Sequence, residues 1–157
     1  MAGSIFAKER SIITLTSTGA SLTNGSAGSA GTDLDVRSSG NAAEDFQSTL
    51  ELKCQWGTVT GIVKGTVVAE LYLVPKLDGT NAPDVDTTSG SSALPYESFA
   101  AVFTAIKAPT ASTDMRFITG TVNLQPILYT AYIINTSGQT ISSNWTLKIV
   151  PAQAQYS

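Results

Sequence analysis

The sequence predicts an all-β fold, a β-sandwich or jelly roll of about eight short antiparallel strands. Apolar residues recur at every second position in several short runs, and turn-forming Gly, Pro, Asn and Asp separate these runs at regular intervals. A chain of 157 residues is also the right length for one domain with one core. The expected strands are residues 11–16, 32–37, 46–56, 66–74, 98–107, 114–124, 127–135 and 145–150. Residues 31–157 would form the sandwich.

Residues 1–30 are expected to form an N-terminal arm. It contains one short strand, with the sequence SIITLT, and then a connector rich in Gly, Ser and Ala. Such a connector is flexible. The strand can therefore either close its own sandwich or join the sheet edge of a neighbouring subunit, and both alternatives stay open. Ile12, Ile13 and Leu15 are interaction candidates for this reason.

Residues 32–37 predict a short strand with Leu34 and Val36 facing inward and Asp33 and Asp35 facing water. The next run, residues 46–56, alternates most strictly and predicts a strand with one wet face. Its expected inner residues are Phe46, Ser48, Leu50, Leu52, Cys54 and Trp56. Cys54 is accordingly interpreted as a small buried apolar residue.

The run at residues 66–74 is apolar on both faces except for Glu70, which predicts a strand covered on both sides. Pro75 removes a backbone donor, and Asp78-Gly79 tolerates turn dihedrals, so we expect the strand to end and reverse there. Residues 75–95 then form a long loop without apolar periodicity.

Residues 98–107 fit both a strand and a helix, and we favour the strand because the neighbouring segments are strands. Gln125-Pro126 marks a turn between the next two strands, and residues 136–139 resemble a hairpin connection. The last strand is expected to end at Pro151, leaving a tail.

The amino-acid composition limits the kinds of functional site that the chain can form. Charged residues make up 13% of the chain and the formal net charge is −3, with nine scattered Lys and Arg, so a nucleic-acid interface is not expected. The chain contains no His and one Cys, which removes the commonest general base and any cysteine pair for zinc. We therefore expect neither an enzyme nor a cofactor or metal site. The segment MAGSIFAKERSIITL lacks the apolar core of a signal peptide and no run is long enough to cross a membrane, so no membrane association is expected.

Several short motifs occur in a fixed order over the C-terminal two thirds of the chain: LYLVPKLDGTNAPD, SSALPYESF, INTSGQT and TLKIVPAQAQYS. In this order they resemble a group of small virion proteins of tailed bacteriophages, similar to capsid decoration or other head-associated structural proteins. The resemblance implies a virion protein that is made in the host cytoplasm and binds major capsid or other virion proteins. It leaves open the position on head, neck or tail. We expect a homo-oligomer, with a trimer favoured.

The alternative function is a glycan-binding module on a virion or cell surface, because exposed aromatic rings stack on sugars. Tyr96 and Trp145 are the residues chosen to test such stacking, from a candidate set of Trp56, Tyr72, Tyr96, Trp145 and Tyr156. Trp and Tyr in strands more often belong to a core or an interface, which is the favoured interpretation of these residues. In the loop at residues 75–95, Asp78 and Asn81 are candidates for an interaction with a glycan or a hard cation. The loop lacks the spacing of a calcium-binding hand, so a solvated turn is the favoured interpretation of its acidic residues.

Overall fold

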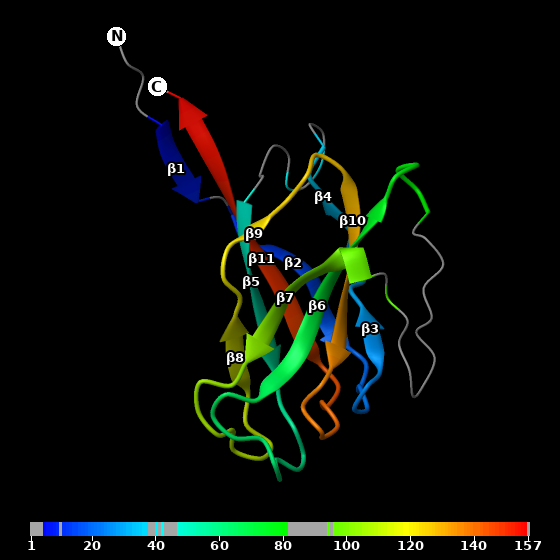
Figure 1. Ribbon diagram of the computed structural model, residues 1–157, viewed down its shortest axis with the longest axis vertical. Coiled ribbons are helices and arrows are strands. Elements are labelled where there is room, and N and C mark those ends of the chain that lie inside the picture. The colour runs from blue at the N-terminus through cyan, green and yellow to red at the C-terminus, as the bar shows by residue number, and fades with distance from the viewer. Residues whose placement is uncertain are drawn as a thin grey trace.

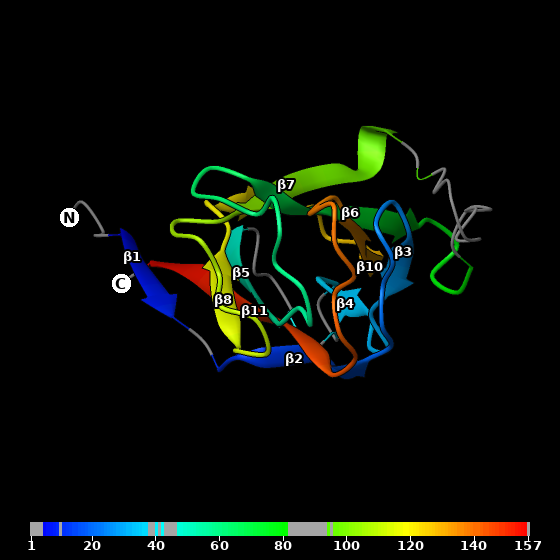
Figure 2. The ribbon, with the colours of Figure 1, turned by 90° about the horizontal axis from the view of Figure 1, so that it is seen from below.

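In the computed structural model the chain is all-β, and its described residues form two antiparallel sheets that pack face to face as a β-sandwich (Figures 1 and 2). The structure describes residues 5–9, 11–37, 40, 42, 47–81, 94 and 96–156; for 5–9, 17, 96 and 151–156 this covers the main chain. No α-helix occurs in this part of the chain, and the one helical element is the short 3-10 helix η1 (Tyr96–Ser98).

The first sheet is built around the long strand β11. Its strands are β1 (Ile5–Glu9), β2 (Ile13–Gly19), β5 (Gln47–Cys54), β8 (Met115–Ile118), β9 (Val122–Asn123) and β11 (Trp145–Tyr156). Strand β11 pairs with β5 on one edge and with β2 and β1 on the other, while β8 and β9 follow one another along the far edge of β5.

The second sheet is built around β10. Its strands are β3 (Ala27–Ser29), β4 (Leu34–Asp35), β6 (Val67–Lys76), β7 (Phe99–Thr104) and β10 (Leu128–Asn135). Strand β10 pairs with β3 and β4 on one edge and with β6 on the other, and β7 lies beyond β6.

The core lies between the sheets. Its largest fully buried side chains are Trp56, Trp145, Phe103, Leu15, Leu34, Leu50, Leu52, Leu71, Ile133, Ile141, Leu147 and Ile149. The ring of Phe117 meets that of Trp56 edge-on, with 5.9 Å between centroids. The predicted alternation of β5 is confirmed for its described residues: Ser48, Leu50, Leu52, Cys54 and Trp56 are all buried. Phe46 lies outside the described residues.

The prediction that a strand ends at Pro75 is wrong. Strand β6 continues through Pro75 to Lys76 and is paired with β10 from Ala69 to Lys76. Strand β7 pairs with β6 only as far as Tyr72. At Pro75, β6 therefore has a described neighbour on one edge alone, which is where a sheet tolerates a residue without an N–H.

Pro151 likewise does not end its strand, since β11 runs on to Tyr156. Pro151 pairs with Ser48 of β5 on one edge. On the other edge it falls between Ile149, the last residue paired with β2, and Ala152, the first paired with β1. The break between β2 and β1 thus coincides with the residue of β11 that cannot donate a hydrogen bond.

The strand expected at residues 11–16 is present as β2, but the flexible connector expected after it is partly built into the sheets, because β2 runs on to Gly19 and residues 27–29 form β3. Strand β2 pairs with β11, and β3, composed of Ala, Gly and Ser, pairs with β10. The glycines serve close packing: a side chain at Gly19 or Gly28 would run into the ring of Trp145. Small residues are therefore used here to let strands approach a large indole.

Residues 136–139 are not a hairpin, because β10 and β11 belong to different sheets. A buried polar network fixes the crossover between them. The Nδ2 of Asn135 donates to the carbonyl oxygens of Leu22 and Gln139, at 2.8 and 2.7 Å. The Nε1 of Trp56 donates to Ser137 Oγ at 3.0 Å. Asn135 is fully buried, so losing these partners would leave a desolvated amide.

The favoured strand at residues 98–107 is confirmed as β7. The strand expected at residues 114–124 is divided into β8 and β9. At the division, Thr119 exchanges two hydrogen bonds with Leu50: its N–H donates to the Leu50 oxygen at 2.9 Å, and its Oγ1 accepts from the Leu50 N–H at 3.0 Å. A side-chain hydroxyl thus replaces one main-chain group of the ladder.

Candidate functional site

The outward face of the first sheet is polar and charged. Glu51 accepts a hydrogen bond from Arg116 at 2.9 Å, and Lys53 pairs with Asp114 at 3.0 Å. Ile118 is an apolar residue on this face and is exposed beside Glu51. Ion pairs on an exposed face contribute little to the unfolding free energy, and their charged groups stay hydrated.

The outward face of the second sheet is mostly apolar. Cross-strand pairing places Val102, Glu70 and Ile134 in one row and Phe99, Tyr72 and Tyr132 in the next. Phe99 is 43% exposed and Val102 39% exposed. We call Glu70, Tyr72, Phe99 and Val102 the outer patch.

Two contacts order the outer patch. The hydroxyl of Tyr72 donates to Glu70 Oε2 at 2.9 Å, and the rings of Tyr72 and Phe99 meet edge-on with 5.6 Å between centroids. The patch therefore combines an exposed aromatic ring with a positioned carboxylate. Its chemistry suits a ligand with both apolar C–H groups and hydroxyl donors, or an apolar protein surface.

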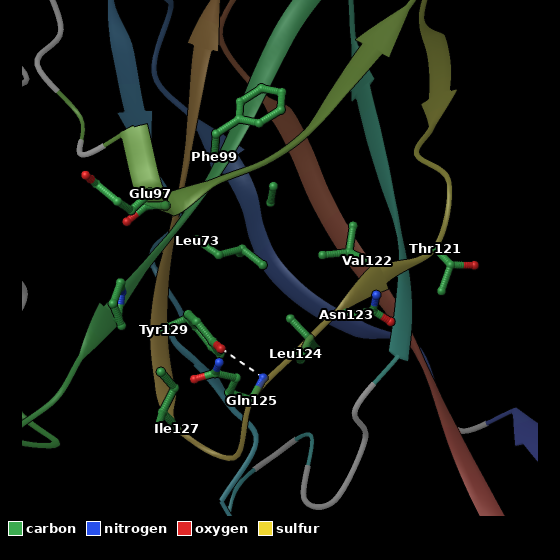
Figure 3. A pocket seen from close by; sticks show the side chains of 13 residues that line it. Leu73, Glu97, Phe99, Thr121, Val122, Asn123, Leu124, Gln125, Ile127 and Tyr129 are labelled. Atoms are coloured by element: carbon green, nitrogen blue, oxygen red, sulfur yellow. Dashed lines mark hydrogen bonds between the residues drawn. The ribbon is translucent and has the colours of Figure 1, made fainter.

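A cleft of about 410 Å³ opens between the two sheets, beside the start of β7 and the strand β9 (Figure 3). Leu73, Val122, Leu124 and Tyr129 are directed into it, while Glu97 and Thr121 lie at its rim. The hydroxyl of Tyr129 accepts a hydrogen bond from the N–H of Gln125 at 2.9 Å. Burial raises the pKa of Tyr129, so the phenol stays neutral. The cleft can hold an apolar group and pairs no nucleophile with a base among its described lining residues.

A two-stranded ribbon extends from the sandwich. It consists of β1 and the part of β11 from Ala152 to Tyr156, paired antiparallel (Figures 1 and 2). The first residue of β1 and the last residue of β11 are paired at its far end in Figure 1. We call this element the terminal ribbon.

The three candidates near the N-terminus lie in or beside β2 and differ in exposure. Ile12 is 61% exposed, Ile13 is partly buried and Leu15 is fully buried. Strand β2 pairs with β11 of its own sandwich, through Ile13↔Ile149 among other positions. Leu15 thus belongs to the core, and Ile12, at the break between β1 and β2, is the one exposed residue of the three.

Trp145 does not offer a stacking face for a sugar, because its side chain is 2% exposed. Its ring packs against Gly19 and Gly28, and its Nε1 donates to the Ala20 carbonyl at 2.7 Å. Tyr96 lies in η1 next to β7, and its side chain is outside the described part of the structure. Of the aromatic pair at the outer patch, Tyr72 was among the candidate stacking rings, whereas the exposed Phe99 was not singled out from the sequence.

Asp78 and Asn81 form a closed turn, as the favoured interpretation of this loop expected. Asp78 Oδ1 accepts from the N–H groups of Thr80 and Asn81 at 2.8 and 2.7 Å, and Oδ2 accepts from Asn81 Nδ2 at 2.8 Å. These bonds, chiefly that from the Asn81 N–H, lower the pKa of Asp78. Gly79 has φ of 76°, which glycine adopts at low cost. The other acidic residues of the loop, Asp84 and Asp86, lie outside the described residues.

Asp33 and Asp35 were expected to face water, but both are paired. Asp33 accepts from Lys76 Nζ at 2.7 Å and from Thr130 Oγ1 at 2.8 Å. Asp35 binds Arg37 through both carboxylate oxygens, and this hydrogen bonding lowers the pKa of Asp35. Asp33, the residue before β4, is thus tied to β6 and β10, whereas Asp35 holds Arg37 two residues further along the chain, and neither carboxylate is left as one of an exposed pair.

Cys54 faces the core, and burial together with the charge of Asp114 raises the pKa of its thiol to about 12. The thiol is therefore neutral near pH 7 and is not an activated nucleophile. Among the described residues, no group of three or more His, Cys, Asp and Glu is placed to hold a metal ion. Within the same residues, no helix has the length and apolar character needed to span a bilayer.

No family model, no curated protein and no solved structure matches this chain significantly. The resemblance to phage virion proteins therefore carries over only as a basis for a proposal.

Proposed function

We propose that this chain is a structural protein of a tailed-bacteriophage virion, a capsid decoration or other head-associated component. It would act by binding major capsid or other virion proteins and catalyse no reaction. The proposal also includes a jelly-roll topology and assembly as a homo-oligomer. The observation that carries it is the order of the strands.

Strands β3 and β4 lie one after the other along the same edge of β10, and β8 and β9 along the same edge of β5, so each pair is counted as one interrupted strand. With β1 left out, each sheet then has four strand positions among the described residues. The pairings are nested: β6 with β7, β5 with β8 and β9, β10 with β3 and β4, and β2 with β11. When one long β-hairpin folds over on itself, its strands pair in this nested order, and such an order is typical of a jelly roll. Jelly rolls recur in viral capsid proteins and in lectins, so the strand order supports the first function and admits the second.

Virion particles purified from cells that make this chain provide the test. We expect mass spectrometry of intact particles to detect the chain, and re-addition of purified protein to particles stripped of it to restore binding. Absence of the chain from intact particles would overturn the proposal.

A second candidate function is glycan binding, and the outer patch favours it. Phe99 presents an exposed ring, and Glu70, oriented by Tyr72, presents a carboxylate that can accept hydroxyl hydrogens. The sugar-binding residues would then be those of β6 and β7 and not Trp145.

A glycan array tests this candidate with the Phe99→Ala and Glu70→Gln variants. We expect binding of a neutral glycan to be lost in both variants and kept in Ile118→Ala, a matched change of an exposed apolar residue on the other sheet. Binding that survives Phe99→Ala and Glu70→Gln would exclude the outer patch.

A further inference from the structure

The pairing of β11 changes along its length. Ala152 is paired both with Gln47 of β5 and with Glu9 of β1, so β5 and β1 lie on opposite edges of β11. Pairing with β5 ends at Ala152, whereas pairing with β1 continues to Tyr156. Among the described residues, the edge of β11 on the β5 side therefore has no partner strand over residues 153–156.

This open edge belongs to the terminal ribbon, which extends away from the two sheets (Figures 1 and 2). A two-stranded ribbon is at best marginally stable in water, and a third strand stabilises it by pairing the free N–H and C=O groups. The ribbon extends beyond the described strands of the sandwich, so no described strand covers this edge.

We propose that residues 153–156 of β11 pair antiparallel with the same residues of a second copy of this chain. An antiparallel strand that pairs with its own copy is related to it by a twofold axis, so one edge serves both partners. The two ribbons then form one four-stranded sheet in the order β1-β11-β11-β1, which connects the first sheets of the two copies.

The sequence of the open edge is compatible with self-pairing. Residues 153–156 read QAQY and contain no Lys, Arg, Asp or Glu, so identical strands can lie side by side without opposing like charges. Pairing through main-chain groups also needs no pocket or special side chain. A second copy is always present wherever the chain is made, and its ribbon has the same length and projection.

This contact does not depend on the proposed virion function, and it differs from the trimer favoured by the sequence. Light scattering measures it directly. We expect the full chain to have twice the mass of the 16.3 kDa monomer. A chain truncated after Ala152 should have the monomer mass and keep the thermal unfolding of the sandwich, because β5 and β2 still pair with the remaining part of β11.

Cysteine cross-linking tests the contact in the untruncated chain. Ala154→Cys and Gln155→Cys are oxidised separately and as an equal mixture, with Thr110→Cys on an exposed loop as the control. If residue 154 or residue 155 lies opposite its own copy, that variant alone forms disulfide dimers. If residue 154 lies opposite residue 155 of the other copy, disulfide dimers form only in the mixture. A disulfide needs Cα atoms within about 7 Å, so the control should form no disulfide-linked dimer. Cys54 is buried and should not compete.

A monomeric or trimeric full chain would overturn the inference, as would a dimer that survives truncation. If the truncated chain unfolds, the cross-linking decides, and failure to cross-link in all three samples overturns the inference. Particle binding is scored separately. A full chain that is monomeric yet loses particle binding on truncation would refute the second copy as occupant and assign the edge to another virion protein. The virion role would then stand, and its homo-oligomer part would fall with the inference.

Discussion

The outward faces of the two sheets differ in chemistry although their inward faces share one core. The face of the first sheet carries paired charges, Glu51 with Arg116 and Lys53 with Asp114. The face of the second carries the outer patch and also residues that are buried despite facing outward, Val74 and Tyr132 among them. The outward face of the first sheet is polar, whereas the outward face of the second sheet is largely apolar and partly buried. The exposed apolar side chains Phe99 and Val102 make the second sheet the expected site for a partner that binds a sheet face.

The largest effect expected from this comparison lies within the first sheet. Leu52→Ala removes a fully buried side chain from the inner face of β5 and should cost about 2 to 5 kcal/mol of unfolding free energy. Glu51→Ala, the adjacent change on the wet face, should cost under about 1 kcal/mol. Urea denaturation of both variants measures the difference, and similar costs would show that the face assignment of β5 is wrong.

The two outward faces can be compared directly. Val74 faces outward on β6 but is fully buried, so Val74→Ala should cost about 1.5 to 3 kcal/mol. Thr49→Ala changes a partly exposed residue on the outward face of β5 and should stay within about 0.5 kcal/mol. Equal, small effects in denaturant titrations would mean that the second sheet is no better covered than the first.

The ion pairs of the first sheet should respond to salt. Arg116→Ala should lower the unfolding free energy by about 0 to 1 kcal/mol at low ionic strength, because the guanidinium is largely exposed. This difference from the unmodified protein should shrink in high salt, since screening acts on exposed pairs. A difference that is large and independent of salt would contradict the description of this face as wet.

The smallest expected effect concerns acid stability at the edge of the second sheet. The pKa of Asp35 is lower in the folded state than in the unfolded chain, where it is about 4. The carboxylate therefore stabilises the fold fully above the unfolded pKa, and this stabilisation is lost as the pH falls through the folded pKa. Asp35→Asn should therefore unfold at a lower temperature than the unmodified chain at pH 5, and this gap should narrow below about pH 4. Calorimetry over this range measures it. A gap that widens in acid would reverse the assigned sign.

Local patterns predicted the strands whose pairing is regular. The alternation of Leu50, Leu52 and Cys54 predicted β5 and its buried face, and the two-sided apolar run predicted β6. The predicted ends at Pro75 and Pro151 were wrong because a proline is tolerated or excluded according to which neighbouring strand lies beside it. That information is not local to the sequence around either proline.

The outer patch could not be found from sequence for a related reason. Phe99 and Tyr72 were both expected on strands, but which face of a strand meets the opposite sheet depends on the order of strands in space. Trp145 was a candidate for an exposed ring only under the alternative function, and Gly19 and Gly28 provide the space that buries it. The one usable signal was the pair of glycines in a stretch that looked like a connector.

The contact between Trp145 and these two glycines constrains how the sequence can evolve. A methyl group at Gly28 would lie 2.9 Å from the indole, and one at Gly19 would overlap it. Neither glycine can mutate first while the tryptophan remains, and a smaller residue at position 145 would leave a void. Diverged relatives are therefore expected to keep all three residues or to have replaced them together, so covariation among positions 19, 28 and 145 would identify distant members of this lineage even where the loops have no common sequence.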